Sequence, residues 1–480
     1  METGVFVMGK VIPRMDSFKI IFIETKQIIA YLHITHFITR KTNGNKKPFS
    51  TFMKILNIKI DGFANIDNLD LDLNKINALV AFNNYGKSNV LSAIQFATTF
   101  IQVPGKIRKE MMAFAGIIPI NKNVDNKPFF FELTTEIKTK KEQYTVIYSF
   151  SFEWLKNGNK GCKIREEHLK IKVNDDAKFK QLIKRANQEA MYLPSVTGRC
   201  DKSILIDEED LVLSKLLSFD ELFYHEVLKA INNIRVVSAD TLRDPASFYQ
   251  TIGPKRIIKA EYDLSFPKDT ETGFFLYSLM IKRKDLYQVF KNAVIALLPE
   301  VATFEPVEID FKEKERIKKG IPLDLPDKLY EIIVIEKYNN QETSINFLSA
   351  GSQKIFYLLE TVIAAELNNI PLLFFEEIEN SIHPALLQKL LIILDSLTEH
   401  TRLIVTSHSP YLIKYLNLES IKIGLPNTKG TAQFKGIKKS KMSKLNKIAS
   451  LYGLPMGDVI FDLMIDASRG ESEILNEICT

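Results

Sequence analysis

The stretch Ala81-Phe82-Asn83-Asn84-Tyr85-Gly86-Lys87-Ser88 decides the fold, because it carries the glycine, lysine and serine of a phosphate-binding loop. It follows the apolar run 76–80, which predicts a strand buried on both faces, and it precedes a segment with helical apolar spacing. In such a loop Lys87 reaches the β and γ phosphates and the Ser88 hydroxyl coordinates Mg²⁺. Ala81 replaces the motif's first glycine, which is harmless only if the backbone φ there is negative. A simple helix cap is the alternative interpretation.

An apolar strand that ends in two carboxylates, 372–377, is the second signal. A Walker B motif has this form. Glu376 is expected to hold Mg²⁺ through water, and Glu377 to polarise the water that attacks the γ-phosphate. Glu376 stands where aspartate is usual. A strand followed by a solvated acidic turn would give the same letters.

Two shorter motifs flank this strand. The hexapeptide Leu348-Ser349-Ala350-Gly351-Ser352-Gln353 opens an apolar-periodic helix, where serine and glycine make either an anion site or an ordinary cap. His408 follows the expected strand 402–406, where its ring is placed to hydrogen-bond a γ-phosphate. A histidine after a strand is more often structural. The order of the four motifs therefore carries more weight than any one of them.

In this order the motifs resemble those of the ABC-class ATPases of the RecF, SMC and OLD kind, which include AAA-type ATPases of prokaryotic defence and abortive-infection systems. The resemblance covers residues 53–425. Residues 83–89 look like the Walker A loop, 348–353 like the ABC signature, 376–384 like the Walker B and D-loop run, and His408 like the switch histidine. No glutamine is assigned to the Q-loop.

The resemblance implies an α/β fold, an ABC-type P-loop NTPase with an antiparallel β subdomain, a parallel core sheet and a mostly helical insertion. It implies ATP and Mg²⁺ as cofactors, with Glu377 and His408 as catalytic residues and Ser88 and Glu376 at the metal. The nucleotide-binding residues would be Asn83, Asn84, Tyr85, Gly86, Lys87, Ser88, Asn89, Ser349, Gly351 and Gln353. In the family, the signature of one subunit faces the phosphate loop of another, so a homodimer is implied.

The sequence pattern divides the chain into five parts. Residues 1–52 form an N-terminal extension that carries no motif and is expected to be dispensable, with Met53 as a candidate start. Residues 53–173 hold Walker A and an antiparallel sheet. Residues 174–325 are expected to be a mostly helical insertion, because apolar residues keep helical spacing in 179–186 and 286–297. Residues 326–425 hold the signature, Walker B and His408. Residues 426–480 form a basic C-terminal segment.

The composition excludes several classes of protein. The 480 residues are 45% hydrophobic and 25% charged, which is typical of globular proteins, and the net charge of +6 permits nucleic-acid contact without requiring it. The three cysteines are far apart, which argues against a disulfide framework or a zinc site and fits a reducing cytoplasm. No apolar run is long enough for a membrane helix, and 20–38 is too often interrupted for a signal peptide.

The favoured hypothesis is a cytoplasmic, Mg²⁺-dependent ATPase whose ATP-driven dimerisation controls a partner effector, in phage defence or nucleic-acid surveillance. The alternative is an ATP-gated scaffold with little turnover that holds an effector inactive. A transporter subunit is disfavoured, because Leu348 follows Lys87 by 261 residues. A nuclease is disfavoured because only 72 residues follow His408, and Asp458, Asp462 and Asp466 are expected on a solvated helix face. The lysines of 435–447 are also expected to be solvated surface.

Overall fold

The computed structural model describes most of the chain from residue 51 onward. The described ranges are 51–82, 85–114, 116–119, 127–140, 142–156, 160–173, 178–239, 250–252, 264–267, 272–310, 328–425, 430–469, 471 and 473–479. All of the described residues belong to one compact unit. The expectation for 1–52, except for its last two residues, and those for Asn83 and Asn84 lie outside the described residues.

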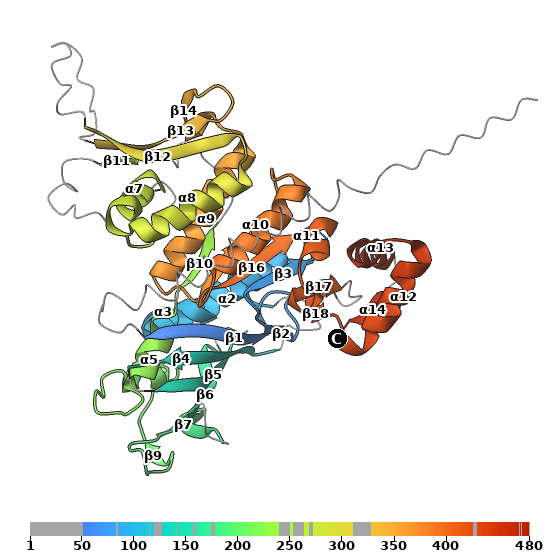
Figure 1. Ribbon diagram of the computed structural model, residues 1–480. Coiled ribbons are helices and arrows are strands. Elements are labelled where there is room, and N and C mark those ends of the chain that lie inside the picture. Colours follow the sequence, from blue (N-terminus) through green and yellow to red (C-terminus); the bar gives the residue numbers. More distant parts are fainter. Residues whose placement is uncertain are drawn as a thin grey trace, which may run out of the picture. The chain divides into compact units, whose positions relative to one another are not determined.

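The first layer is an eight-stranded antiparallel sheet with the order β2-β1-β4-β5-β6-β7-β8-β9 (Figure 1). Its strands are β1 (Phe52–Asp61), β2 (Leu69–Asp72), β4 (Phe129–Lys138), β5 (Gln143–Glu153), β6 (Lys163–Val173), β7 (Lys180–Ala186), β8 (Glu189–Tyr192) and β9 (Lys202–Ser203). In β1 the buried positions change from Met53 and Ile55 to Ile58 and Ile60, because a bulge lies between Ile55 and Asn57. The predicted antiparallel sheet is confirmed.

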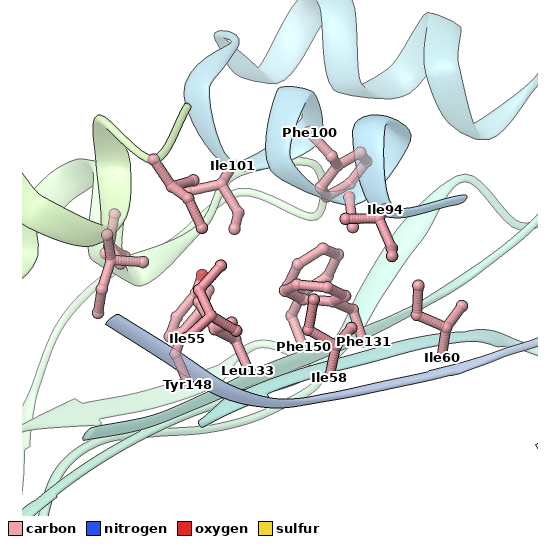
Figure 2. Close-up of a cluster of buried hydrophobic side chains, with 14 of the residues drawn as sticks. Ile55, Ile58, Ile60, Ile94, Phe100, Ile101, Phe131, Leu133, Tyr148 and Phe150 are labelled. Atoms are coloured by element: carbon pink, nitrogen blue, oxygen red, sulfur yellow. The ribbon is translucent and has the colours of Figure 1, made fainter. Parts of the chain in front are cut away.

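Helix α2 (Lys87–Gln102) packs its apolar face on this sheet. Figure 2 shows Ile94, Phe100 and Ile101 of α2 facing side chains of β1, β4 and β5. The Phe100 ring stacks on Phe150 and Phe152, with centroids 5.1 and 4.9 Å apart. This core fixes the position of α2, and with it the loop that precedes the helix.

The second layer is a six-stranded sheet with the order β10-β15-β16-β3-β17-β18. Its strands are β3 (Ile76–Val80), β10 (Val236–Ala239), β15 (Leu372–Phe375), β16 (Arg402–Ser407), β17 (Ile421–Leu425) and β18 (Gln433–Gly436). The strands from β10 to β17 run parallel, and β18 is antiparallel to β17. The predicted parallel core is confirmed, and every residue of β3, β15 and β16 is buried. The carboxyl ends of these three strands lie at one edge of the sheet.

The prediction of a helix over 179–186 is wrong. These residues form β7, which pairs with β6 so that Ile183 lies opposite Leu169. The spacing of Leu182 and Ile183 is compatible with a helix and also with a strand that has one irregular step. The segment forms a strand because it can pair with the edge of β6. The prediction of a helix over 286–297 is confirmed by α8 (Lys284–Leu297).

The described residues of the insertion are mixed rather than mostly helical. Besides β7 to β10 it contains α4 (Val212–Leu216), α5 (His225–Asn232), β11 (Gln250–Ile252), α7 (Thr272–Lys282), α8 and β12 (Val301–Asp310). Strand β10 belongs to the core sheet and β12 to a third, smaller sheet. These strands form by pairing over long sequence distances. Their local sequence therefore carries no helical or strand pattern strong enough to predict them.

The third sheet has the order β11-β13-β12, with β14 (Glu342–Ser344) also paired to β13 (Lys328–Glu336). A short 3₁₀ helix, η3 (Ile345–Phe347), leads from β14 into α9 (Ala350–Leu367). Phe356 of α9 packs edge-on against Phe304 of β12 and Phe290 of α8. These contacts hold the helix that carries the predicted signature.

The remaining described elements are helices. In the sequence α3 (Gly105–Met112) follows α2, and α10 (Pro384–Leu397) lies between β15 and β16. After β16 come α11 (Pro410–Tyr415), η4 (Leu418–Ser420), η5 (Lys439–Lys441), α12 (Met442–Tyr452), α13 (Met456–Ser468) and α14 (Glu473–Ile478). Asp458, Asp462 and Asp466 lie on α13, as expected, and none of them is buried. Among the described helices none alone is long and apolar enough to cross a membrane, although the pair 439–452 and 456–467, bent by 94°, passes a test of length and composition.

Candidate nucleotide site

The phosphate-binding loop lies between the end of β3 and the start of α2. Gly86 is the N-cap of α2 and has a φ of 87°, in the region that favours glycine. A Cβ atom at Gly86 would lie 2.5 Å from the Cβ of Ala432. Space and backbone conformation therefore both require glycine at this position.

Ala81 fits the structure without strain. It is not among the described non-glycine residues with positive φ, and its side chain is buried. Its methyl group lies beside Gly424 of β17, where an added Cβ would come within 2.5 Å of the Ala81 Cβ. A glycine in the neighbouring strand thus makes room for the alanine that replaces the motif's first glycine.

Lys87 is the buried cation of the site. Its Nζ donates hydrogen bonds to the carbonyl oxygens of Ala81 and Phe82, at 2.6 and 3.1 Å, and lies 3.0 Å from Nδ1 of His408. Burial lowers the pKa of Lys87 to about 8, against the opposing effect of Glu377, Glu379 and Glu376. An anionic ligand would replace the carbonyl oxygens as partners and restore the charge.

The other described loop residues have different environments. The half-buried Tyr85 has its ring 6.2 Å from that of Phe82, and Ser88 is exposed on the first turn of α2. The side-chain amide of Asn89 donates to Oδ1 of Asn65 at 2.7 Å. Asn89 therefore ties the start of α2 to the loop between β1 and β2, and its contact with nucleotide stays a prediction, as do those of Tyr85 and Ser88.

The two carboxylates follow β15 directly. Glu377 has a positive φ of 47°, and its backbone N–H donates to the Thr406 hydroxyl at 3.2 Å. Its Oε1 lies 3.0 Å from Nε2 of His408, and its Oε2 accepts from the amide of Asn380. Glu376 is half-buried and contributes to the negative field at Lys87.

His408 connects the loop and the acidic strand end. Its Nδ1 lies 3.0 Å from both Lys87 Nζ and the Ala81 carbonyl oxygen, while its Nε2 faces Glu377. The structure thus brings Lys87, Glu377 and His408 together, although they are far apart in the sequence.

Glu379 completes this arrangement and was not predicted as a site residue. Its Oε1 accepts hydrogen bonds from the Ser407 hydroxyl at 2.5 Å and from the His408 backbone N–H at 3.2 Å. Its Oε2 is buried and has no hydrogen-bond partner within the described structure. The sequence signal for it was available, since Glu379 lies two residues beyond Glu377 in the same acidic run.

The predicted signature opens α9. Ser349 caps the helix by accepting from the Ser352 N–H at 3.2 Å, and its exposed side chain hydrogen-bonds only Ser352 among the described residues. A Cβ at Gly351 would lie 2.2 Å from the Ser381 carbonyl oxygen, so a local contact already requires glycine there. Nucleotide contacts of Ser349 and Gly351 stay predictions.

Gln353 has an internal role in this chain. Its buried side-chain amide donates to the carbonyl oxygens of Ile345, Asn346 and Leu348, at 3.2, 3.1 and 3.0 Å. These bonds shape the segment between β14 and α9. A nucleotide contact made through Nε2 would require Gln353 to give up these bonds, and the predicted contact with nucleotide stays a prediction.

Lys354, the next residue, is a second buried lysine that the sequence analysis missed. Its Nζ donates to the carbonyl oxygens of Glu377 and Asn380, at 2.8 and 3.1 Å. Burial lowers the pKa of Lys354 to about 8. A lysine on the apolar side of a helix, next to Ile355 and Phe356, was the signal that could have found it.

The site fits Mg²⁺ as a partner of nucleotide phosphates. Ser88 offers an exposed hydroxyl, Glu376 a half-buried carboxylate, and Glu379 a buried oxygen without a partner among the described residues. No group of three or more histidine, cysteine or acidic residues in the described part of the chain could hold a metal by itself. Mg²⁺ commonly binds through one or two protein oxygens together with phosphates and water, so the residues present are suitable.

A phosphate-binding loop after β3, acidic residues after β15, and a histidine after β16, the strand between these two, define an ABC-type P-loop ATPase fold. The family model described as "AAA domain, putative AbiEii toxin, Type IV TA system" matches residues 76–414, and the chain belongs to this family. No curated protein sequence matches the chain.

Three solved structures of SMC heads are similar to this chain. A head bound to the C-terminal winged-helix domain of ScpA is 12% identical, with a TM-score of 0.44, over 81% of this chain and 99% of that one. The head domain from Thermotoga maritima is 12% identical, with a TM-score of 0.37, over 80% and 99%. A Pyrococcus furiosus head with an extended coiled coil, bound to the C-terminal domain of ScpA, is 13% identical, with a TM-score of 0.43, over 83% and 100%.

Proposed function

We propose that this protein binds ATP with Mg²⁺ and hydrolyses it. One observation carries the proposal: a continuous set of contacts runs from Lys87 through His408 to Glu377, and so joins the phosphate loop to the acidic strand end. A lysine with a purely structural role would not need to contact a histidine that follows one strand and, through it, a glutamate that follows another. Membership of an AAA domain family supports the same function.

The residues have separate roles in this proposal. Lys87 exchanges the carbonyl oxygens of Ala81 and Phe82 for phosphate oxygens of the nucleotide. Ser88 and Glu376 would hold Mg²⁺, which when bound would supply positive charge to offset the charge that develops on the transferred phosphoryl group. Glu377 orients and activates the attacking water, and His408 holds Glu377 and contacts the γ-phosphate.

The proposal includes an ATP-driven homodimer. Ser349 and Ala350 are exposed at the N-terminus of α9, where the free N–H groups of a helix favour an anion. Within the described residues the exposed Ser349 side chain hydrogen-bonds only Ser352, so it is available to a nucleotide held by a second copy of the chain. Dimerisation would control an effector protein in the cytoplasm, in phage defence or nucleic-acid surveillance; the family's description names a putative toxin of a type IV TA system.

Glu377→Gln tests the proposal. Glutamine keeps the size of the side chain and removes the carboxylate charge, so ATP binding should persist while hydrolysis stops. Light scattering with ATP should give a transient dimer for the wild type and a lasting dimer for the variant. Glu189→Gln, an exposed change at the start of β8, is the matched control and should behave as the wild type.

The same experiment decides between hydrolysis and the scaffold alternative. The replacement of aspartate by Glu376 and the ties between Lys87 and its own loop favour a slow enzyme. The wild type and Glu377→Gln could instead form equally lasting ATP dimers and release the same negligible amount of phosphate. That outcome would reject the ATPase proposal in favour of an ATP-gated scaffold. Absence of ATP binding by the wild type would exclude both.

A further inference from the structure

Lys354 places a buried ammonium between the signature helix and the acidic strand end. The residue is 5% exposed, and its Nζ donates to the backbone carbonyls of Glu377 and Asn380 rather than to a carboxylate. The charges of Glu379 and Glu377 act on it only through space. Burying a lysine costs free energy unless its ammonium group is hydrogen-bonded, so the two carbonyl groups are needed to keep Lys354 in this position.

The carbonyl groups that Lys354 binds belong to a strained segment. Glu377 has a φ of 47° and Ser381 a φ of 65°, both in the left-handed region that side chains other than glycine rarely adopt. Such a conformation persists only where surrounding contacts fix it. Lys354 fixes the carbonyl group of Glu377, and the Thr406 hydroxyl fixes its N–H group.

A second contact joins the same two segments. Gly351 packs so closely on the Ser381 carbonyl oxygen that an added Cβ would lie 2.2 Å from it. The first turns of α9 therefore touch both ends of the segment 377–381. A displacement of the N-terminus of α9 must move this segment, because neither contact leaves free space between them.

We propose that Lys354 is a positioning residue that couples the start of α9 to the backbone of Glu377. This inference rests on the proposed ATPase function and on the role proposed there for Ser349. When the nucleotide of a second copy docks at Ser349, Lys354 transmits the resulting position of α9 to Glu377 of its own chain. Lys354 itself contacts neither ATP nor the attacking water.

Lys354→Met tests the coupling, since methionine keeps most of the apolar stem and removes the ammonium group. The kcat for ATP should fall by about 10- to 100-fold, because a shift of about 1 Å in a catalytic group has an effect of this size. The KM should change by less than about threefold, since the phosphate loop is untouched. Light scattering should show a lasting ATP dimer, as for Glu377→Gln.

Two further variants separate positioning from general stability. Lys354→Arg keeps donors for both carbonyl groups and should retain kcat within about fivefold of the wild type. Ile355→Val shortens a fully buried neighbour on α9 without touching the coupling, and it should leave kcat and KM unchanged. If Lys354→Met does not fold, Lys354→Gln, whose amide ends short of the two carbonyl oxygens, takes its place with the same expected division between kcat and KM.

The outcomes distinguish this inference from the proposed function. An active wild type together with an equally active Lys354→Met overturns the inference alone. Equal losses in kcat and ATP affinity, shared by Ile355→Val, would also overturn it, because they indicate a general loss of stability. A wild type that binds ATP without hydrolysing it overturns both proposals.

Discussion

Nζ of Lys87 lies 3.0 Å from Nδ1 of His408, a contact between residues 321 positions apart in the chain. It forms because β3 and β16 are parallel neighbours, with Val80 paired to Ser407, so that the residues after each strand meet at one edge. Nε2, the other ring nitrogen of His408, contacts the carboxylate of Glu377. The buried lysine, the histidine and the glutamate are therefore linked by two successive contacts. In the proposed function, the phosphates of the nucleotide contact Lys87 at one end of this set of three residues.

Replacing Lys87 by alanine should abolish ATP binding. The ammonium group is buried at the phosphate-binding loop, and hydrogen bonds between charged groups are among the strongest in proteins. We expect ATP affinity to fall by about 100-fold or more, as measured by calorimetry on a protein with an unchanged circular dichroism spectrum. Lys447→Ala, an exposed change on α12, is the control. Unchanged affinity in folded Lys87→Ala would refute the assignment of the phosphate loop.

Binding of ATP should be linked to proton uptake. Because burial lowers the pKa of Lys87 to about 8, about half of the free protein carries a neutral lysine at pH 8, and phosphate oxygens favour the charged form. ATP binding at pH 8 should therefore take up roughly half a proton, and affinity should fall by up to about tenfold per pH unit above pH 8. Calorimetry in buffers of different ionisation enthalpy measures the uptake.

Lys87→Arg is the matched control for this effect. The guanidinium group stays protonated throughout the range, so its ATP binding should take up no proton near pH 8. Equal uptake by Lys87→Arg would assign the titration to another group.

The sequence allowed the core of the site to be predicted, because its motifs are local. The loop with Gly86 and Lys87 lies between a buried strand, apolar except for Asn77, and a helix, and the parallel arrangement then brings the strand ends together. Glu377 and His408 follow from the same rule. Their mutual contact through the imidazole ring depends on side-chain conformations and could not be predicted.

Features that depend on tertiary contacts were missed or wrongly predicted. The apolar spacing of 179–186 is compatible with helix and strand, and pairing with β6 selects the strand. The buried positions of Lys354 and Gln353 depend on carbonyl groups that face α9 from other segments. The effect of Ala81 could not be judged without the neighbouring strand, where Gly424 provides the space.

Ala81 and Gly424 should be energetically coupled. Gly424→Ala would bring two methyl groups within 2.5 Å, and overpacking of this kind typically costs about 1–3 kcal/mol in the free energy of unfolding. The double variant Ala81→Gly/Gly424→Ala moves the methyl group to the other strand and should recover most of that loss. Urea denaturation of the two single variants and the double variant measures the coupling, and additive effects would contradict the packing.

Ala81→Gly alone should leave ATP affinity within about twofold of the wild type. The φ of Ala81 lies outside the positive region, so glycine relieves no strain there. A large gain in affinity on restoring this glycine would mean that the alanine does hinder the loop.

Glu360 should make the protein less stable as the pH rises. It lies on α9, fully buried, with only the Thr272 hydroxyl as a described partner, 3.4 Å from its Oε2. Burial raises the pKa of Glu360 from 4.5 to about 8. Between these two pH values the folded protein binds a proton that the unfolded chain has released, so the free energy of unfolding falls by up to about 1.4 kcal/mol per pH unit.

Glu360→Gln removes this titration while it keeps the shape of the side chain. At pH 5 the variant and the wild type should have similar free energies of unfolding, since both carry a neutral group, and at pH 8 the variant should be the more stable by several kcal/mol. Urea denaturation at pH 5, 6, 7 and 8 measures the difference, with the exposed Glu189→Gln as a control that should show no pH dependence relative to the wild type. A difference that stays constant with pH would mean that Glu360 is ionised in the folded protein, which would require a cation or water beside its Oε1.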